Sequence, residues 1–212
     1  LADFEHKEAK VDPESGKKKP VYRWNYESLT EEVYEAHLNG KLSIGIQPCN
    51  EDAEARLGVI DVDPTDYDDF NKKFFIDIIQ DYDLPLIPIE SKSGGLHLCL
   101  FMDQFTDAKA VKSFLTNLLP LFKLKPSNEI FPKQTELTRD EETEKLKPGQ
   151  FINLPYYGGE RRALNIDGTP FEIDKFLEVV EANLVSKGQL EIITANIDKK
   201  IYEGTDADLM DG

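Results

Sequence analysis

The chain has 212 residues, 40% of them hydrophobic, which suits one large domain or a core with an appendage. Its 25 basic and 41 acidic residues give a formal net charge of −16, which argues against a protein that coats nucleic acid through a broad cationic face. No apolar run is as long as a membrane span and residues 1–5 are polar, so neither a membrane segment nor a signal peptide is expected. Cys49 and Cys99 have apolar neighbours, which predicts reduced core residues and no zinc site.

Composition divides the chain into three parts. Residues 1–20 are polar and predict a flexible or hairpin segment. Their basic tip at 17–19 is either a solvated loop or a contact for phosphate. The main core is expected over residues 21–185, followed by a helix and an acidic tail over 186–212.

Hydrophobic periodicity and turn residues predict mixed helices and strands within the core. In chain order we expect a strand at 21–24, a helix at 28–38 with a capping box, a strand at 42–46, a polar loop at 48–56, a strand at 57–63, a helix at 66–82, a strand at 84–90, a turn at 91–95, a strand at 96–102 and a helix at 106–119 capped by Thr106. The order continues with a strand at 128–133, a charged loop at 137–149, a strand at 150–155, a hairpin at 165–171 and a helix at 173–184. Because strict β-α-β alternation is missing, the predicted fold class is α+β, or mixed α/β.

The strand at 57–63 is an apolar run that ends in two acids, Asp61 and Asp63. Its apolar character predicts burial on both faces. Alternate side chains of a strand share a face, so the two carboxylates point the same way and can bind a hard divalent cation. The alternative is that Asp-x-Asp is a common tripeptide of solvated turns.

The segment 91–97 reads Ser-Lys-Ser-Gly-Gly-Leu-His and opens the following strand. Its two glycines allow backbone N–H groups to approach an anion, and His97 faces opposite to the leucines that flank it. Alone, this is equally an ordinary hairpin turn with an ordinary histidine. Beside an acid pair, however, it indicates a metal site next to a cradle for phosphates, as nucleotidyl transfer requires.

The order of three motifs resembles the archaeo-eukaryotic primase superfamily: residues 59–63, residues 91–97 and the stretch Phe-Ile-Asn-Leu-Pro at 151–155. Residues 128–134 are similar to the Phe-Pro-x-Gln stretch of primase-polymerases from phages, plasmids, CRISPR-associated loci and TOTE conflict systems. Residues 22–25 and 37–40 also resemble the lead-in of that branch, so the likeness covers roughly residues 20–160. It implies an RRM-like catalytic sheet packed against a smaller α/β unit.

The resemblance also implies roles for residues of the first two motifs. Asp61 and Asp63 would hold Mg²⁺ or Mn²⁺, as two ions, and no zinc is expected. The residues that would bind the nucleotide's phosphates are Ser91, Lys92, Ser93, Gly94 and His97.

The third motif departs from the family pattern, because Asn153 stands where many members have aspartate. Glu129 is the substitute that we expect as third metal ligand, with an exposed strand acid as the alternative. Lys133 and Asn153 are expected at the nucleotide. Arg161 and Arg162 are expected either at the template backbone or as plain surface charges.

Two aromatic residues and one histidine complete the candidates. Tyr156 and Tyr157 either stack on a base or sugar or pack into the core. His37 is interpreted as a helix-end residue that the helix dipole favours.

The resemblance implies a primase-polymerase that joins nucleoside triphosphates on a single-stranded or primed DNA template by a two-metal mechanism. A helicase or accessory domain is expected elsewhere in the parent protein, in the cytoplasm of a bacterial, archaeal or phage-infected cell. Two alternatives are a Mn²⁺-dependent nucleotide-sugar glycosyltransferase, which also uses Asp-x-Asp, and a non-catalytic module that binds nucleotide or nucleic acid.

Overall fold

The computed structural model describes residues 29–197, apart from 68, 143 and 145, together with short strands between residues 2 and 24. Helices mix with antiparallel sheets, which confirms the predicted α+β class. The helices with two described ends are α1 (Glu31–Leu38), α2 (Lys72–Asp81), α3 (Ala108–Leu118) and α4 (Ile173–Ala182), and the 3-10 turns are η1 (Pro64–Asp66) and η2 (Tyr157–Gly159). Residues 187–197 are also helical.

The larger sheet has four antiparallel strands in the order β7-β8-β6-β9, namely β7 (Ile87–Glu90), β8 (Leu96–Asp107), β6 (Glu54–Val62) and β9 (Ile130–Phe131). Helix α2 connects β6 to β7, and α3 connects β8 to β9. The connectivity is therefore β-α-β-β-α-β, with the first and third strands in the middle. Strand β8 carries His97 and β6 carries Asp61, but β6 ends at Val62 and not at 63 as predicted, because the Asp63 side chain accepts from the Thr65 N–H and caps η1.

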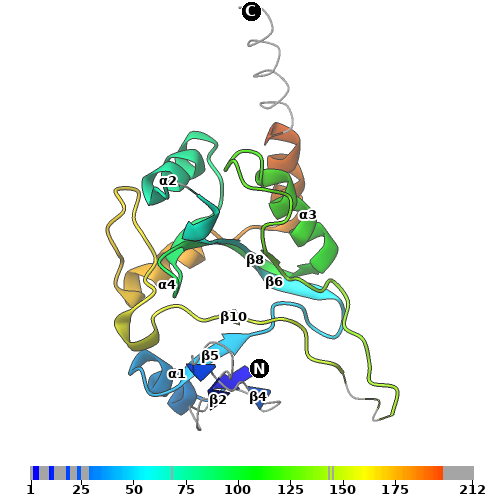
Figure 1. Cartoon of the computed structure of the whole chain (residues 1–212). Coiled ribbons are helices and arrows are strands. Elements are labelled where there is room, and N and C mark those ends of the chain that lie inside the picture. Colours follow the sequence, from blue (N-terminus) through cyan, green and yellow to red (C-terminus); the bar gives the residue numbers. More distant parts are fainter. Residues whose placement is uncertain are drawn as a thin grey trace, which may run out of the picture.

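The smaller sheet has the order β10-β5-β1-β4, with β10 (Ile152–Asn153), β5 (Ser43–Ile46), β1 (Ala2–Phe4) and β4 (Arg23–Trp24). A separate hairpin pairs β2 (Lys10–Val11) with β3 (Lys18–Lys19). Figure 1 shows the smaller sheet and α1 on one side of the larger sheet, and α2 and α3 on the other. The remainder of the predicted N-terminal segment and the predicted acidic tail lie outside the described residues.

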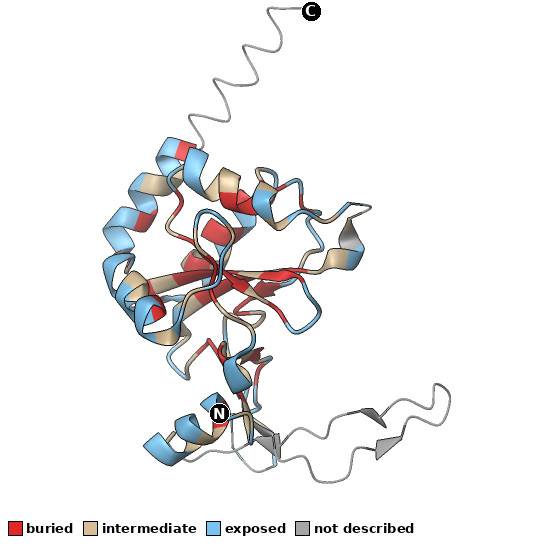
Figure 2. Cartoon of the chain, turned by 90° about the vertical axis from the view of Figure 1, so that its left-hand side faces the viewer, coloured by how far each residue is buried: buried red, intermediate tan, exposed pale blue. Residues whose placement is uncertain are grey.

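Hydrophobic cores lie on both faces of the larger sheet, as the apolar run of β6 predicts. Ile60 belongs to the core that includes Leu115 of α3. Its neighbour Val59 faces the opposite way and belongs to the core that includes Ile152 of β10 and Phe176 of α4. Figure 2 shows the buried residues concentrated along this sheet, with exposed residues on the outer sides of the helices. Both faces of β6 are therefore packed, which holds Asp61 near the end of the strand in a fixed position.

The predicted starts of two helices are wrong, for the same reason. Helix α2 begins at Lys72 and not at 66, because the Asn71 side chain accepts a hydrogen bond from the Lys73 N–H. Strand β8 continues to Asp107, whose side chain accepts from the Ala110 N–H and caps α3. In both places a polar side chain stops the preceding segment and opens the helix. Thr106, the predicted cap of α3, is a buried strand residue.

Several strand boundaries differ from the predicted ones because a strand extends only as far as a neighbouring strand pairs with it. Strand β6 begins at Glu54 and not at 57, because the far end of β8 pairs with it beyond a bulge. Three predicted strands shorten to the residues that find a partner: β7 begins at Ile87, and β9 and β10 have two residues each. Of the predicted capping box at 28–31, Ser28 lies outside the described residues, and α1 begins after Thr30 without a side-chain cap.

The two cysteines are buried free thiols, as predicted, and burial raises the pKa of both. Among the described residues, no helix is long and apolar enough to cross a membrane.

Candidate active site

Strand register places Asp61 between two polar residues on neighbouring strands. Asp61 lies opposite His97 of β8, and on its other side its N–H donates to the Glu129 carbonyl over 2.9 Å. Directly opposite residues of an antiparallel pair point to the same face. Glu129, Asp61 and His97 therefore form one transverse row at the end of the larger sheet.

Asp61, Asp63 and Glu129 line one pocket of about 340 Å³. The pocket also includes Thr65, and Asp63 accepts hydrogen bonds from the Thr65 backbone N–H at 2.9 Å and from its hydroxyl at 2.8 Å. These two bonds lower the pKa of Asp63 and keep it ionised. The pocket therefore has three acidic residues in its lining, the acid pair and Glu129.

The donor chemistry of this pocket suits a hard divalent cation, because carboxylate oxygens are the ligands that Mg²⁺ and Mn²⁺ prefer. Within the described part of the chain, however, no three acidic, histidine or cysteine side chains stand close enough together to hold one ion. The Glu129 carboxylate instead accepts a hydrogen bond from Lys133 Nζ at 2.6 Å. Asp61 and Asp63 are therefore the first candidates to bind a cation. Glu129 would have to break its ion pair with Lys133 before it could bind the same cation.

His97 is a neutral imidazole held against the acid pair. Its side chain is 12% exposed, and Nε2 lies 3.6 Å from Asp61 Oδ1. Burial, and secondly the charge of Arg161, lower the pKa of His97 to about 4. The contact with Asp61 is therefore not an ion pair at pH 7, and His97 is available as a neutral hydrogen-bonding group.

The turn at 91–95 packs directly on the end of β6. A Cβ on Gly95 would stand 2.0 Å from the Val62 carbonyl oxygen, so only glycine fits there. Gly94 has φ +88°, and its missing Cβ would meet nothing, which leaves that side of the turn open. The hydroxyls of Ser91 and Ser93 lie 3.0 Å apart. The predicted tight turn is thus present. Gly95 allows its close contact with the Val62 carbonyl, and Gly94 allows its left-handed backbone conformation.

Arg161 and Arg162, predicted together, have different surroundings. The Arg161 guanidinium lies over the Tyr157 ring, with 4.9 Å between Cζ and the ring centroid, and its Nε and Nη1 atoms are buried without a hydrogen-bond acceptor. Its charge contributes to lowering the pKa of both His97 and His37, so it lies near both imidazoles. Arg162 instead pairs with Glu172 at 2.8 Å. Only Arg161 therefore presents buried, unused donors near the row.

Sequence comparison agrees with this geometry. The family model described as "TOTE conflict system, Archaeo-Eukaryotic Primase domain" matches residues 4–170. The chain belongs to this family. No curated protein gave a significant match. Membership confirms the resemblance inferred from the motifs and implies a primase-type nucleotidyltransferase, in a family that generally uses divalent metals.

The remaining predicted residues of the primase domain are more remote from its acid pocket. Asn153 lies on β10, in the smaller sheet, opposite Gly45, and does not line the pocket. Lys133 reaches the site only through its ion pair with Glu129. Lys92 and Ser93 are exposed on the turn. Tyr156 packs in the core, at 5% exposure.

His37 does far more in this primase domain than end a helix. It is 2% exposed, its Nε2 donates to the Pro155 carbonyl over 2.8 Å, and its Nδ1 accepts from the Ile44 N–H at 3.1 Å. The interpretation through the helix dipole is therefore wrong, because the imidazole joins α1 to β5 and to the 155–161 loop. A sequence signal existed: Val33, Ala36 and His37 have the spacing of one inward helix face.

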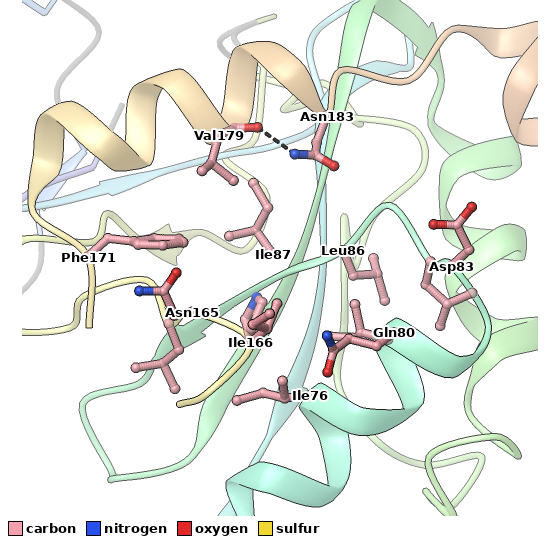
Figure 3. Close-up of a pocket in the computed structure, with 14 residues that line it drawn as sticks. Ile76, Gln80, Asp83, Leu86, Ile87, Asn165, Ile166, Phe171, Val179 and Asn183 are labelled. Carbon is pink, nitrogen blue, oxygen red and sulfur yellow. Dashed lines mark hydrogen bonds between the residues drawn. The ribbon is translucent and has the colours of Figure 1, made fainter. Parts of the chain in front are cut away.

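A second pocket, of about 220 Å³, lies apart from the acids (Figure 3). Apolar side chains from α2, β7 and α4 dominate it, including Ile76, Ile87 and Val179. Its described lining has one charged residue, Asp83, and no cation. It is therefore not a candidate for binding the nucleotide's phosphates.

Proposed function

We propose that this primase domain is a template-dependent primase-polymerase, which joins nucleoside triphosphates on a single-stranded or primed DNA template. The observation that carries the proposal is the row of Glu129, Asp61 and His97, which sets a carboxylate pocket beside a phosphate-binding turn. The β-α-β-β-α-β sheet and the smaller α/β unit beside it support the RRM-like catalytic core that the family resemblance implies.

Asp61 and Asp63 would hold Mg²⁺ or Mn²⁺, with Glu129 as the third ligand. When bound, the ions neutralise phosphate charge and lower the pKa of the attacking 3′-hydroxyl. Thr65 fixes the orientation of the Asp63 carboxylate by its two hydrogen bonds. Lys133 neutralises Glu129 until that carboxylate is used, and is then free to approach the nucleotide.

The triphosphate would lie against the open side of the 91–95 turn. His97, as a neutral imidazole, donates or accepts a hydrogen bond there without repelling a cation. Lys92 adds an exposed positive charge, and Ser91, Ser93 and Gly94 supply hydroxyls and open backbone. Arg161 would be a second phosphate ligand, since its buried Nε and Nη1 have no hydrogen-bond acceptor in the structure.

The proposal also includes a DNA template and a contact between Asn153 and the nucleotide. A helicase or accessory domain would belong to the parent protein. Arg162 would contact the template backbone only by leaving Glu172. The family match supports this function over a glycosyltransferase, which needs no counterpart of residues 91–97.

The test is primer extension and primer synthesis on a single-stranded template, with Mn²⁺ or Mg²⁺ and labelled nucleotides. Asp61→Asn with Asp63→Asn should abolish the products, whereas Glu178→Gln, an exposed acid paired with Lys175, should not. Hydrolysis of a sugar nucleotide would support a glycosyltransferase instead. Nucleotide or DNA binding without turnover would support a non-catalytic module.

A further inference from the structure

The loop at 156–161 has an unfavourable backbone. Tyr156 (φ 64°) and Arg161 (φ 55°) are left-handed although both have a Cβ, and Gly158 and Gly159 between them have φ of 59° and 80°. Such conformations persist where the surroundings fix them, and they are concentrated at functional sites. The loop therefore has a shape that its neighbours must hold.

Tyr156 anchors the start of the loop in the core. Its hydroxyl donates to the Phe171 carbonyl and accepts from the Ala163 N–H, both at 3.3 Å. Its backbone N–H donates to the Arg161 carbonyl over 3.3 Å, which closes the loop. The two ends of the loop are therefore fixed to each other and to the core that includes Ile152 and Phe176.

Tyr157 is held from the other side, by the end of α1. Its hydroxyl donates to the Gly40 carbonyl over 2.7 Å, and its ring centroid is 5.5 Å from that of the buried His37. The two backbones touch, since a Cβ on Gly40 would lie 3.2 Å from the Gly158 Cα. The smaller unit thus fixes the plane of the Tyr157 ring.

We propose that Tyr157 is a positioning residue for nucleotide binding: its ring, fixed by α1, holds the Arg161 guanidinium in place, and a triphosphate that gains access to Nε and Nη1, which are closed to solvent in the free protein, would supply the acceptor that they lack. The 4.9 Å between Arg161 Cζ and the ring centroid is a cation–π distance, and those two nitrogens have no other acceptor. The proposal rests on the proposed function. It makes the smaller α/β unit, which supplies no acid to the pocket, part of the nucleotide site.

A double-mutant cycle tests the proposal. The affinity for an α,β-imido deoxynucleoside triphosphate with Mn²⁺ is measured by calorimetry for the wild type, Tyr157→Leu, Arg161→Gln and the double variant. Tyr157→Leu should raise Kd by roughly 2- to 30-fold, the range of a cation–π contact, but should have almost no further effect once Arg161 is Gln. Tyr157→Phe keeps the ring and its contact with His37 but loses the hydrogen bond to Gly40, so it should raise Kd less than Tyr157→Leu does. In steady-state extension, Tyr157→Leu should raise KM more than it lowers kcat.

An equal loss of affinity from Tyr157→Leu in both backgrounds would overturn the proposal, because a merely structural role does not depend on Arg161. If circular dichroism shows that the leucine variant is unfolded, the same cycle is run with Tyr157→Met. Lys123→Gln, which removes the cation from a pair with Phe74 outside this site, is the matched control and should bind like the wild type. If Arg161→Gln itself binds normally while the wild type extends primers, the positioning role fails and the primase function stands.

Discussion

Asp61 has a different neighbour on each side, and the two neighbours differ in the charge that they bring close to its carboxylate. His97 is neutral and adds no competing charge, although its Nε2 is 3.6 Å away. Glu129 adds a second carboxylate to the same pocket, but Lys133 holds it at 2.6 Å. At the scale of single residues, Glu129 is therefore the residue whose substitution best tests the proposed third metal ligand.

Glu129→Gln should weaken Mn²⁺ binding by about tenfold or more, because affinity follows the number of charged ligands. Calorimetric titration with Mn²⁺ measures this without turnover, and primer extension should fall with it, nearly as far as in Asp61→Asn. Glu136→Gln is the control, since this exposed acid pairs with Lys109 outside the pocket. Wild-type affinity for Mn²⁺ in Glu129→Gln would remove Glu129 from the site.

The buried His37 makes stability depend on pH. Burial is the main cause that lowers its folded-state pKa from the usual 6.5, so the unfolded chain takes up a proton first as pH falls. The stability from the neutral imidazole is complete above about pH 6.5 and is lost as pH falls toward the lower folded pKa. His97 acts in the same direction, with a pKa of about 4.

His37→Gln should therefore show a smaller loss of unfolding free energy between pH 7 and pH 5 than the wild type. Urea denaturation at the two pH values measures it, and His97 cancels because both proteins contain it. Identical losses in the two proteins would show that His37 keeps an ordinary pKa in the folded state.

At the scale of elements, the site depends on how one turn sits on one strand end. The turn at 91–95 can approach β6 only because Gly95 has no side chain, and the approach brings the strand with His97 beside the acid pair. Strand β6 itself is fixed between β8 and β9, with cores on both faces. Local sterics thus decide how closely the 91–95 turn approaches the end of β6 and its carboxylates.

Gly95→Ala should destabilise the fold by about 2–4 kcal/mol, as a side chain forced against backbone does in a packed interior. Gly94→Ala is the matched control, because its Cβ meets nothing and only φ +88° is strained, which costs about 1–2 kcal/mol. Thermal and urea unfolding compare the two variants. Equal stabilities, or a more stable Gly95→Ala, would contradict the close packing of turn and strand.

At the scale of the whole molecule, charge works against DNA. The net charge of −16 repels phosphate, so the proposed binding of DNA would depend on a few local cations such as the exposed Lys92. Because each phosphate contact releases counterions, the number of contacts appears in the salt dependence of the affinity.

The affinity of this chain alone for a single-stranded oligonucleotide should be weak, with a slope of log K against log salt between about −1.4 and −2.1, which corresponds to two or three contacts. Fluorescence anisotropy between roughly 50 and 300 mM salt measures the slope. A slope steeper than about −4 would mean six or more contacts and a broad cationic face, which contradicts this account of the surface.

The sequence alone predicted the features that depend on near neighbours. The apolar run predicted a strand buried on both faces with Asp61 near its end, and paired glycines predicted the tight turn before His97. These predictions hold because side-chain alternation and backbone sterics act within a few residues. The motif order was enough to identify the family.

Only the tertiary structure decided which distant residues meet. Strand register set Glu129 and His97 on either side of Asp61, and folding buried His37 against Pro155, 118 residues away in the chain. It also gave Arg161 and Arg162, which are adjacent in sequence, different partners: Arg162 pairs with Glu172, whereas two guanidinium nitrogens of Arg161 are buried without an acceptor. Register, desolvation and unpaired donors are properties of assembled surfaces, and for that reason no local pattern in the sequence fixes them.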